Sequence, residues 1–356
     1  MAAFRVGIIG CGQTRASGRA TGAGISHRHA EGYNATPDAE IVALADIVIE
    51  NAKAFQELHG GERLYTDYRE MLAQENLDIV SVCTWPHLHA PMVIAACEAG
   101  VKAVHCEKPM APTYGEALAM VRAAEAHGVQ LTFNHQRRFG APFRKAKELL
   151  KAGAIGELVR LEASTSNMYD WGTHWFDMLF YYNDETPVEW VLGQIDPRGG
   201  REIFGVYVEG QGISYFRYRN GVYGLMVTGK DTGWTAENRL IGTEGVIEVG
   251  ISPEAPLRIW PKGRADWGPV AVDEGIHAQS HFHRAILDVV NALKMGRESE
   301  LAARKALQTT ELIFATYESS RRRGRVALPL QIEDSPLLSM LRDDATGGVD
   351  AEMQAL

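Results

Sequence analysis

Short apolar strands alternate with helices over the first 135 residues, and this alternation constrains the fold more than any other feature of the chain. We expect strands at residues 4–9, 40–45, a short one beginning at 65, 77–84, the first half of 101–110, and 130–134. Strands that are joined by helices pair in parallel, and helices then cover both faces of the sheet. We therefore predict a doubly wound parallel sheet over residues 1–135.

A glycine turn, Gly10-Cys11-Gly12, follows the first strand, and a helix begins near Ser26. Bare glycines let backbone amides approach a pyrophosphate, which the helix N-terminus also attracts. Asp46 ends the second strand, where a carboxylate would bind the ribose hydroxyls of NAD and repel the 2′-phosphate of NADP. We therefore predict a Rossmann domain that binds NAD, with NADP less favoured.

The spacing of this fingerprint is unusual. Gly12 and Asp46 are 34 residues apart, whereas about 20 is usual. Residues 14–24 have the composition of an inserted loop, and they include Arg15 and Arg19. We hypothesise that this loop folds over the pyrophosphate or reaches a neighbouring subunit; a surface loop without such a role is the alternative.

Two later strands of the first domain end in residues that suit chemistry. Lys108 follows the fifth strand directly, and ligands bind beyond the carboxyl ends of such strands. A solvated loop lysine would fit this segment equally well. Trp85 and His89 follow the fourth strand and are expected to line the cofactor. A metal site at His87 and His89 is disfavoured, because no cysteine or carboxylate lies near them in the sequence.

After residue 135 the pattern changes to strands with few intervening helices. We expect strands at 158–165, 205–209, 212–218, 222–228, 239–242, 246–249 and 257–260, and helices at 279–294 and 300–322. Asn220-Gly221 suits a two-residue hairpin turn. Residues 136–332 should therefore form an α+β domain with an open, mainly antiparallel sheet, one face of which is available for subunit packing. Residues 333–356 are expected to form a loosely held polar tail.

A carboxylate and an imidazole open this second domain. If residues 170–181 form a helix, Asp170 and His174 share one face of it. Histidine titrates near neutral pH, and an adjacent carboxylate orients it and raises its basicity, which suits acid/base chemistry. A purely structural pair is the alternative. Metal binding with Asp177 is disfavoured, because one imidazole with carboxylates is a thin ligand set for zinc.

Composition argues against several classes of partner. The 356 residues carry a net charge of −9 and show no basic stripe, which argues against nucleic-acid binding. We see no apolar run of membrane-spanning length and no signal peptide, so we expect no membrane partner and a cytoplasmic location. The four cysteines lie in apolar segments without Cys-x-x-Cys spacing, which suits a reducing compartment.

Together these motifs resemble the glucose-fructose oxidoreductase, inositol dehydrogenase and MocA (Gfo/Idh/MocA) family. The resemblance runs from about residue 4 to residue 330 and is carried by Gly10-Cys11-Gly12, Asp46, Glu107-Lys108-Pro109, Arg138-Phe139 and Asp170-x-Gly-x-His174. It implies a Rossmann domain with an open-sheet domain, an NAD(P)-dependent sugar or polyol oxidoreductase, and a homodimer or homotetramer built through the second sheet. By position, Lys108, Asp170 and His174 match the family's catalytic lysine, aspartate and histidine. Two departures are the 14–24 insertion, which disrupts the third fingerprint glycine, and an unusually rich aromatic cluster, Tyr169, Trp171 and Trp175, which suggests a ring-bearing substrate.

We therefore expect hydride transfer between nicotinamide and a secondary hydroxyl of a sugar, inositol or glycoside. His174 would take the hydroxyl proton, Lys108 would stabilise alkoxide character, and Asp170 would orient His174 or hold a neighbouring hydroxyl. The expected cofactor contacts are Gly10, Gly12, Gln13, Thr14, Asp46, Thr84, Trp85, His89, Glu107, Lys108 and Gln136. The expected substrate contacts are Lys108, Arg138, Tyr169, Asp170, Trp171 and His174; no metal is expected. The alternatives are an NAD-dependent glycosidase or lyase that oxidises a ring transiently, and a non-catalytic regulator that senses NAD or a sugar.

Overall fold

The computed structural model describes residues 2–12, 24–230, 232 and 236–345. The chain forms two compact units, and both are discontinuous in sequence. The first comprises Met1–Ala111, Glu116–Phe139 and His277–Leu307, and the second comprises Pro112–Gly115, Gly140–Ile276 and Gln308–Leu356. No helix of the described ranges combines the length and the apolar character needed to span a bilayer.

The first unit is built on a six-stranded parallel sheet in the order β3-β2-β1-β4-β5-β6. Its strands are β1 (Phe4–Ile9), β2 (Ala39–Ala45), β3 (Arg63–Tyr65), β4 (Ile79–Val82), β5 (Ala103–Cys106) and β6 (Gln130–Phe133). The connecting helices are α1 (Ser26–Asn34), α2 (Ile49–His59), α3 (Tyr68–Gln74), α4 (Pro86–Glu98) and α5 (Tyr114–His127). From β1 the chain adds β2 and β3 on one side, and it then crosses to the other side to add β4, β5 and β6. The boundary between β1 and β4 is therefore the topological switch point, where doubly wound sheets bind ligands. The predicted Rossmann topology is confirmed.

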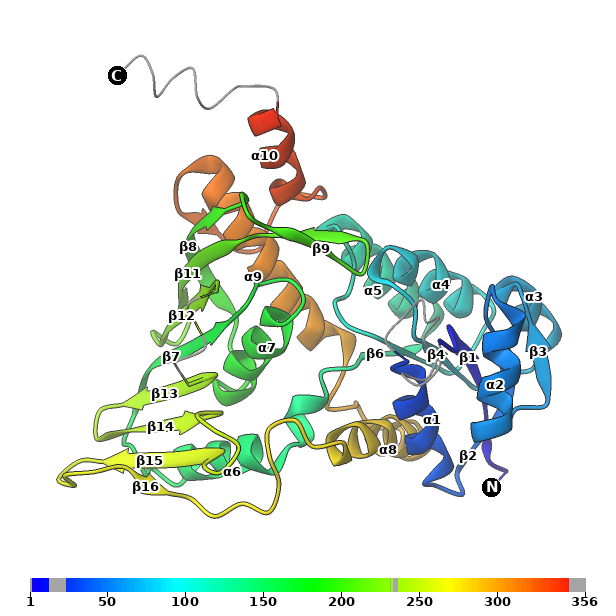
Figure 1. The fold of residues 1–356 in the computed structure, drawn as a ribbon, viewed down its shortest axis with the longest axis horizontal. Coiled ribbons are helices and arrows are strands. Elements are labelled where there is room, and N and C mark those ends of the chain that lie inside the picture. Colours follow the sequence, from blue (N-terminus) through cyan, green and yellow to red (C-terminus); the bar gives the residue numbers. More distant parts are fainter. Residues whose placement is uncertain (1, 13–23, 231, 233–235, 346–356) are drawn as a thin grey trace. The chain divides into compact units, whose positions relative to one another are not determined.

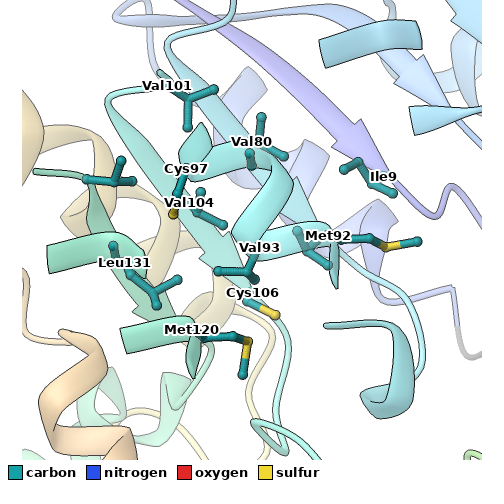
Figure 2. Close-up of a cluster of buried hydrophobic side chains, with 14 of the residues drawn as sticks. Ile9, Val80, Met92, Val93, Cys97, Val101, Val104, Cys106, Met120 and Leu131 are labelled. Atoms are coloured by element: carbon teal, nitrogen blue, oxygen red, sulfur yellow. The ribbon is translucent and has the colours of Figure 1, made fainter. Parts of the chain in front are cut away.

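Alternate residues of these short strands face two separate apolar cores. Ile79 of β4 packs in a core with Ala30 of α1 and Phe55 of α2. The next residue, Val80, points to the opposite face, as the two-residue period of a strand requires. There it packs with Val93 of α4 (Figure 2). Burial on both faces explains why the strands are continuously apolar.

Helix α8 (Ser280–Met295) belongs to the first unit, whereas we expected it in the second domain. It lies beside α1 (Figure 1), and its Ile286 and Val290 complete the core on that face of the sheet. The approach is close, because a Cβ on Gly32 of α1 would lie 2.6 Å from Cβ of Ile286. The apolar face of α8 predicted a helix but could not indicate which sheet it covers.

The second unit contains a nine-stranded sheet in the order β16-β15-β14-β13-β7-β12-β11-β8-β17. Its strands are β7 (Leu158–Thr165), β8 (Val188–Asp196), β11 (Gln211–Tyr218), β12 (Tyr223–Thr228), β13 (Asn238–Gly242), β14 (Gly245–Val249), β15 (Leu257–Pro261), β16 (Gly268–Pro269) and β17 (Val326–Ala327). Only the β7–β12 pair among these described strands is parallel, so the predicted, mainly antiparallel sheet is confirmed.

Two details of this sheet differ from the prediction. Strand β8 was missed, because Glu189 and Gly193 interrupt its apolar pattern. Gly193 is required there by close packing, since a Cβ would lie 2.5 Å from Cγ2 of Thr316 in α9 (Ala303–Arg322). The strand expected at 205–209 lies instead in a separate two-stranded ribbon, β9 (Arg201–Ile203) with β10 (Val206–Val208).

The remaining helices of the second unit are α6 (Ala141–Lys151), α7 (Gly172–Tyr182) and α10 (Pro336–Ala345). Residues 336–345 were expected to be part of a loose tail, and that expectation was wrong. Leu337 is buried, and Arg321 pairs with Asp334 and donates to Oγ of Ser339. These contacts hold α10 against the end of α9.

Candidate active site

The first position of the turn after β1 accepts only glycine. Gly10 has a φ of +85°, in the left-handed region. A Cβ there would lie 3.0 Å from the carbonyl oxygen of Cys83 and 2.9 Å from Cγ2 of Thr84. The backbone of the turn therefore packs directly against the residues that follow β4.

The unusual spacing of the fingerprint does not displace helix α1. A Cβ on Gly12 would lie 3.3 Å from Cα of Gly24, so the chain returns to the turn before α1 begins. Ile25 at the N-cap has an apolar side chain, which cannot accept a hydrogen bond from the first turn. The N–H groups of His27 and Arg28 in this turn donate instead to the carbonyl oxygens of Gly24 and Ile25. The expected contacts at Gln13 and Thr14, and the hypothesised loop except Gly24, lie outside the described residues.

Asp46 fastens the glycine turn. Its Oδ2 accepts hydrogen bonds from the backbone N–H groups of Cys11 at 3.0 Å and Gly12 at 3.2 Å. Its Oδ1 accepts one from the backbone N–H of Val48 at 2.9 Å and one from the side-chain amide of Asn51 at 3.2 Å. A carboxylate offers about four acceptor positions, so these donors use them all. Binding of ribose hydroxyls to Asp46 would therefore require it to share or exchange one of these bonds.

The residues after β4 differ in exposure. Trp85 is 40% exposed, and α4 begins directly after it. His89, which was expected to line the cofactor, lies in the first turn of α4 and is fully buried. Its Nε2 lies 3.1 Å from the carbonyl oxygen of Thr84, and its Nδ1 lies 3.0 Å from that of Pro109. The geometry therefore places His89 as a link between two loops, with Thr84 and Trp85 nearer the surface.

Glu107 is the centre of a buried hydrogen-bond network beyond β5. Its Oε1 lies 2.9 Å from Nε2 of His29 and accepts the amide of Asn134 at 2.6 Å, and its Oε2 accepts the backbone N–H of Lys108 at 3.1 Å. Burial alone would raise the pKa of this carboxyl, but the hydrogen bond and charge of His29, with the bond from Asn134, lower the pKa to about 2. Glu107 is therefore a carboxylate that points inward, and half-buried Lys108 follows it.

Two residues after β6 have different surroundings. Gln136 is 5% exposed, and its buried Oε1 has no hydrogen-bond partner among the residues that the structure describes. Arg138 is 1% exposed, and its guanidinium pairs with Glu300 at 3.1 Å inside the first unit. An unsatisfied buried acceptor suits a ligand that donates hydrogen bonds. The ion pair of Arg138 instead indicates a structural role.

Asp170 lies in a turn before α7, and the prediction of a helix over 170–181 was wrong at its start. Asn167 organises this turn: its Oδ1 accepts the backbone N–H of Asp170 at 2.7 Å, and its carbonyl oxygen accepts that of Gly172 at 2.8 Å. Asp170 and His174 therefore do not share a helical face. Both are nonetheless largely buried, at 6% and 3% exposure.

The aromatic residues around this turn divide into exposed and buried members. The indole of Trp171 is 39% exposed, and its ring centroid lies 6.3 Å from that of His174. Tyr169 is buried, and Trp175 packs in the core, where its ring centroid lies 5.9 Å from that of Phe143. Trp171 is therefore the member of the cluster that is best placed to meet a ligand.

Sequence reasoning missed Glu209, which fastens the same turn. Its Oε1 accepts the backbone N–H of Met168 at 2.6 Å and the hydroxyl of Thr228 at 3.0 Å, and its Oε2 accepts the hydroxyl of Tyr317 at 2.7 Å. Burial raises the pKa of Glu209, although these hydrogen bonds oppose the change. His29 and Asn134 were also missed; the only signal in the sequence was their polarity beside apolar segments.

The described residues contain no group of three histidine, cysteine, aspartate or glutamate side chains arranged to hold a metal ion. The candidate chemistry therefore divides between the two units: the glycine turn, Glu107, Lys108 and Gln136 in the first, and the turn from Asn167 to Gly172 with His174 in the second.

Residues 4–135 match a family described as oxidoreductase family, NAD-binding Rossmann fold. The chain carries the NAD-binding domain of the Gfo/Idh/MocA oxidoreductases. The resemblance seen in the sequence is thereby confirmed for the domain that contains the glycine turn and Lys108.

Relatives of this chain include dehydrogenases of sugars and polyols. It is 37% identical over 153 residues to the D-apiose dehydrogenase of Paraburkholderia graminis, a match that covers 43% of this chain and 38% of that protein. It is 26% identical over 261 residues to the myo-inositol 2-dehydrogenase of Thermotoga maritima, covering 68% of this chain and 74% of that protein. The first match thus spans less than half the length of the relative.

The whole fold is shared with a solved structure. The WlbA dehydrogenase from Bordetella pertussis, in complex with NADH and UDP-GlcNAcA, is 24% identical, with a TM-score of 0.75 over 92% of this chain and 100% of that chain. The likeness in fold therefore extends through both compact units.

Proposed function

We propose that this protein is an NAD-dependent oxidoreductase that transfers a hydride between nicotinamide and a secondary hydroxyl of a sugar, inositol or glycoside. The observation that carries the proposal is the position of Lys108. It follows β5, at the same sheet edge as the glycine turn, and an inward-pointing carboxylate holds its backbone. The names of the sugar and inositol dehydrogenases above support the same class of substrate.

The residues of the first unit fit NAD in three respects. The glycine turn lies at the start of α1, where a helix N-terminus attracts a pyrophosphate. The charge of Asp46 disfavours a 2′-phosphate. The orphaned Oε1 of Gln136 would accept a hydrogen bond from the nicotinamide amide. The bound cofactor supplies the carbon that accepts or returns the hydride.

The chain's own groups would handle the proton and the developing charge. The ammonium of Lys108 donates a hydrogen bond to the substrate oxygen and stabilises it as alkoxide character develops. His174 takes the hydroxyl proton, and Asp170 orients His174 or holds a neighbouring hydroxyl. Tyr169 shapes the same turn, and the exposed indole of Trp171 offers a flat apolar surface on which the C–H face of a sugar ring can stack.

The test is a panel of hexoses, inositols and methyl glycosides assayed for NADH absorbance with wild-type protein and Lys108→Ala. We expect turnover of the variant to fall on the order of a hundredfold or more, as when a transition-state donor is removed. NAD should still bind to the variant and quench its protein fluorescence. Near-wild-type turnover by Lys108→Ala with a confirmed substrate would contradict the assignment. Release of an aglycone without net NADH would instead favour the glycosidase alternative.

We also propose that the protein is a homodimer or homotetramer built through the second sheet. Strand β8 exposes Leu192 (49%), and its neighbour β11 exposes Ile213 (44%) and Tyr215 (36%). Tyr215 also stacks on Tyr223 of the next strand, β12, with ring centroids 5.5 Å apart. Exposed apolar residues that adjoin one another mark an interaction site more often than scattered single residues do. Leu192→Arg should shift the sedimentation coefficient towards that of the monomer; an unchanged assembly would place the interface elsewhere.

The proposal includes a reducing compartment, namely the cytoplasm. All four cysteines are free thiols, and Cys11, Cys97 and Cys106 are buried. Burial raises the pKa of these three thiols, which makes them poorly reactive. Localisation of a tagged full-length protein would test this part.

A further inference from the structure

We propose that His29 and Asn134 are positioning residues for Lys108, and that they act on it through the side chain of Glu107. The inference rests on the proposed function, because it gives Lys108 a geometric requirement that only catalysis needs. It also changes the role expected for Glu107 from a cofactor contact to a link between the interior of the sheet and the catalytic loop.

The direction of the Glu107 side chain is the first observation. The residue is only 6% exposed, and both carboxylate oxygens bond to groups of its own unit. Oε1 meets Nε2 of His29 and the amide of Asn134, while Oε2 accepts the N–H of the next residue, Lys108. The carboxylate is therefore bonded to the backbone N–H of Lys108, the residue whose side chain is proposed to act on the substrate. Its own orientation is set by His29 and Asn134.

The second observation is that His29 is itself fixed at its other ring nitrogen. Nδ1 lies 2.8 Å from Oγ of Ser81, and the hydroxyl of Tyr33 lies 3.2 Å from the same oxygen. Ser81 is fully buried in β4, and Tyr33 belongs to α1 as His29 does. One continuous chain of hydrogen bonds thus connects α1 and β4 with the peptide of Lys108, and Asn134 adds the end of β6.

The third observation is that burial makes this network sensitive to loss of one member. A buried carboxylate that loses a donor is left partly unpaired, and the chain rearranges to satisfy it. Movement of Glu107 would move the peptide of Lys108, and a misplacement of about 1 Å at a reacting group can cost about a hundredfold in rate. We therefore expect His29→Ala and Asn134→Ala to lower kcat by about a hundredfold, with the KM and the affinity for NAD little changed.

His105 offers a matched control. It is also fully buried, its ring centroid lies 4.8 Å from that of His29, and its Nδ1 lies 2.9 Å from Oγ1 of Thr132 instead of Glu107. His105→Asn keeps a nitrogen near Thr132 and removes a comparable buried ring. His29→Gln supplies an N–H donor on a side chain of similar reach, so its kcat should be much closer to that of the wild type than the kcat of His29→Ala. If His29 only filled space, this recovery would not depend on an N–H donor.

The experiment uses the full chain with NAD and with myo-inositol, D-glucose and methyl β-D-glucopyranoside as probes. It measures kcat and KM, the primary deuterium isotope effect on the oxidised carbon, and the exchange of backbone amides in the peptide 103–110 by mass spectrometry. A misplaced lysine slows hydride transfer, so the isotope effect should rise in His29→Ala. A variant that merely contains less folded enzyme would keep the wild-type isotope effect and KM.

The outcomes are distinguishable from those of the proposed function. Loss of kcat in His29→Ala and Asn134→Ala, a raised isotope effect, recovery by His29→Gln and retention by His105→Asn would support the inference. Equal losses in His29→Ala and His105→Asn would overturn it. If the wild-type protein oxidises none of the probes, the proposed function fails for them. Amide exchange then still tests whether His29 positions the backbone of Lys108. Faster exchange of the peptide 103–110 in His29→Ala than in His105→Asn supports the positioning role, and equal exchange refutes it.

Discussion

Glutamine substitution of two buried glutamates should change the pH dependence of stability in opposite directions. Glu107 has a pKa of about 2 against an ordinary value of 4.5, because His29 and Asn134 bond its charged form despite burial. Its carboxylate therefore contributes stability above about pH 4.5, and that contribution is lost as the pH falls through about 2. At about 1.4 kcal/mol per pKa unit the full contribution is about 3 kcal/mol, of which about 1 kcal/mol is lost between about pH 6 and about pH 3.5.

Glu209 has the opposite sign. Burial raises its pKa above the ordinary 4.5, although Tyr317, Met168 and Thr228 donate hydrogen bonds to it. The fold therefore favours the protonated form. The stability that this preference contributes is fully present below about pH 4.5 and is lost as the pH rises through the raised pKa. Glu209→Gln keeps the shape of the protonated carboxyl and does not titrate.

The assay is urea unfolding of the wild-type protein, Glu107→Gln and Glu209→Gln, followed by circular dichroism at a series of pH values from about 6 to about 3.5. On acidification the stability advantage of the wild type over Glu107→Gln should shrink by about 1 kcal/mol. The wild type should meanwhile gain stability relative to Glu209→Gln. A gap for Glu107→Gln that stays constant or widens as the pH falls would refute the reasoning from the His29 and Asn134 contacts.

Three further substitutions test the packing and the site. Gly32→Ala places a Cβ against Ile286 and should destabilise the first unit by about 1–3 kcal/mol in thermal unfolding, as overpacking does; Ile286→Ala in the same chain should relieve most of the loss, and additive losses would contradict the packing of α8 on α1. Gly10→Ala forces an alanine to a φ of +85° and should weaken NAD binding measured by fluorescence quenching, whereas unchanged affinity would remove Gly10 from the cofactor site. Trp171→Ala should leave stability within about 0.5 kcal/mol, because the side chain is exposed, but raise the KM for a ring substrate; an equal effect on a linear polyol would argue against stacking.

The fold of the first unit could be predicted from the sequence because its signals are local. Each buried strand is a short apolar run, and a helix of regular period follows it, so five of the six strands were placed nearly at their observed bounds. The exception is β3, which was expected to begin at residue 65 but ends there. The assignment of α8 could not be made in this way. Its apolar face is complementary to α1 through Ile286 and Gly32, more than 200 residues apart in sequence, and periodicity identifies a buried face without naming its partner. Strand β8 was missed for a related reason, because Gly193 fits the surface of α9 and breaks the apolar pattern.

The candidate site was predictable as positions but not as contacts. The ends of strands indicated Asp46 and Lys108, because the carboxyl edge of a parallel sheet gathers ligand-binding loops. His29, by contrast, is 78 residues from Glu107, and Asn134 is 27 residues from it. Hydrogen bonds between such groups follow no sequence period. The turn at Asn167 likewise replaced the expected first turn of α7, since the side chain of Asn167 offers the backbone a competing partner.

Asp46 and Glu107 illustrate the physical reason why expected roles and observed contacts differ. Both carboxylates follow parallel strands, and both were expected to contact the cofactor. A carboxylate that is removed from water needs donors for its oxygens, and the nearest donors at the edge of a sheet are the backbone N–H groups of the neighbouring loops. Asp46 therefore bonds the glycine turn, and Glu107 bonds the peptide of Lys108. The acidic residues at this edge therefore hold in place the loops that carry the glycines and Lys108.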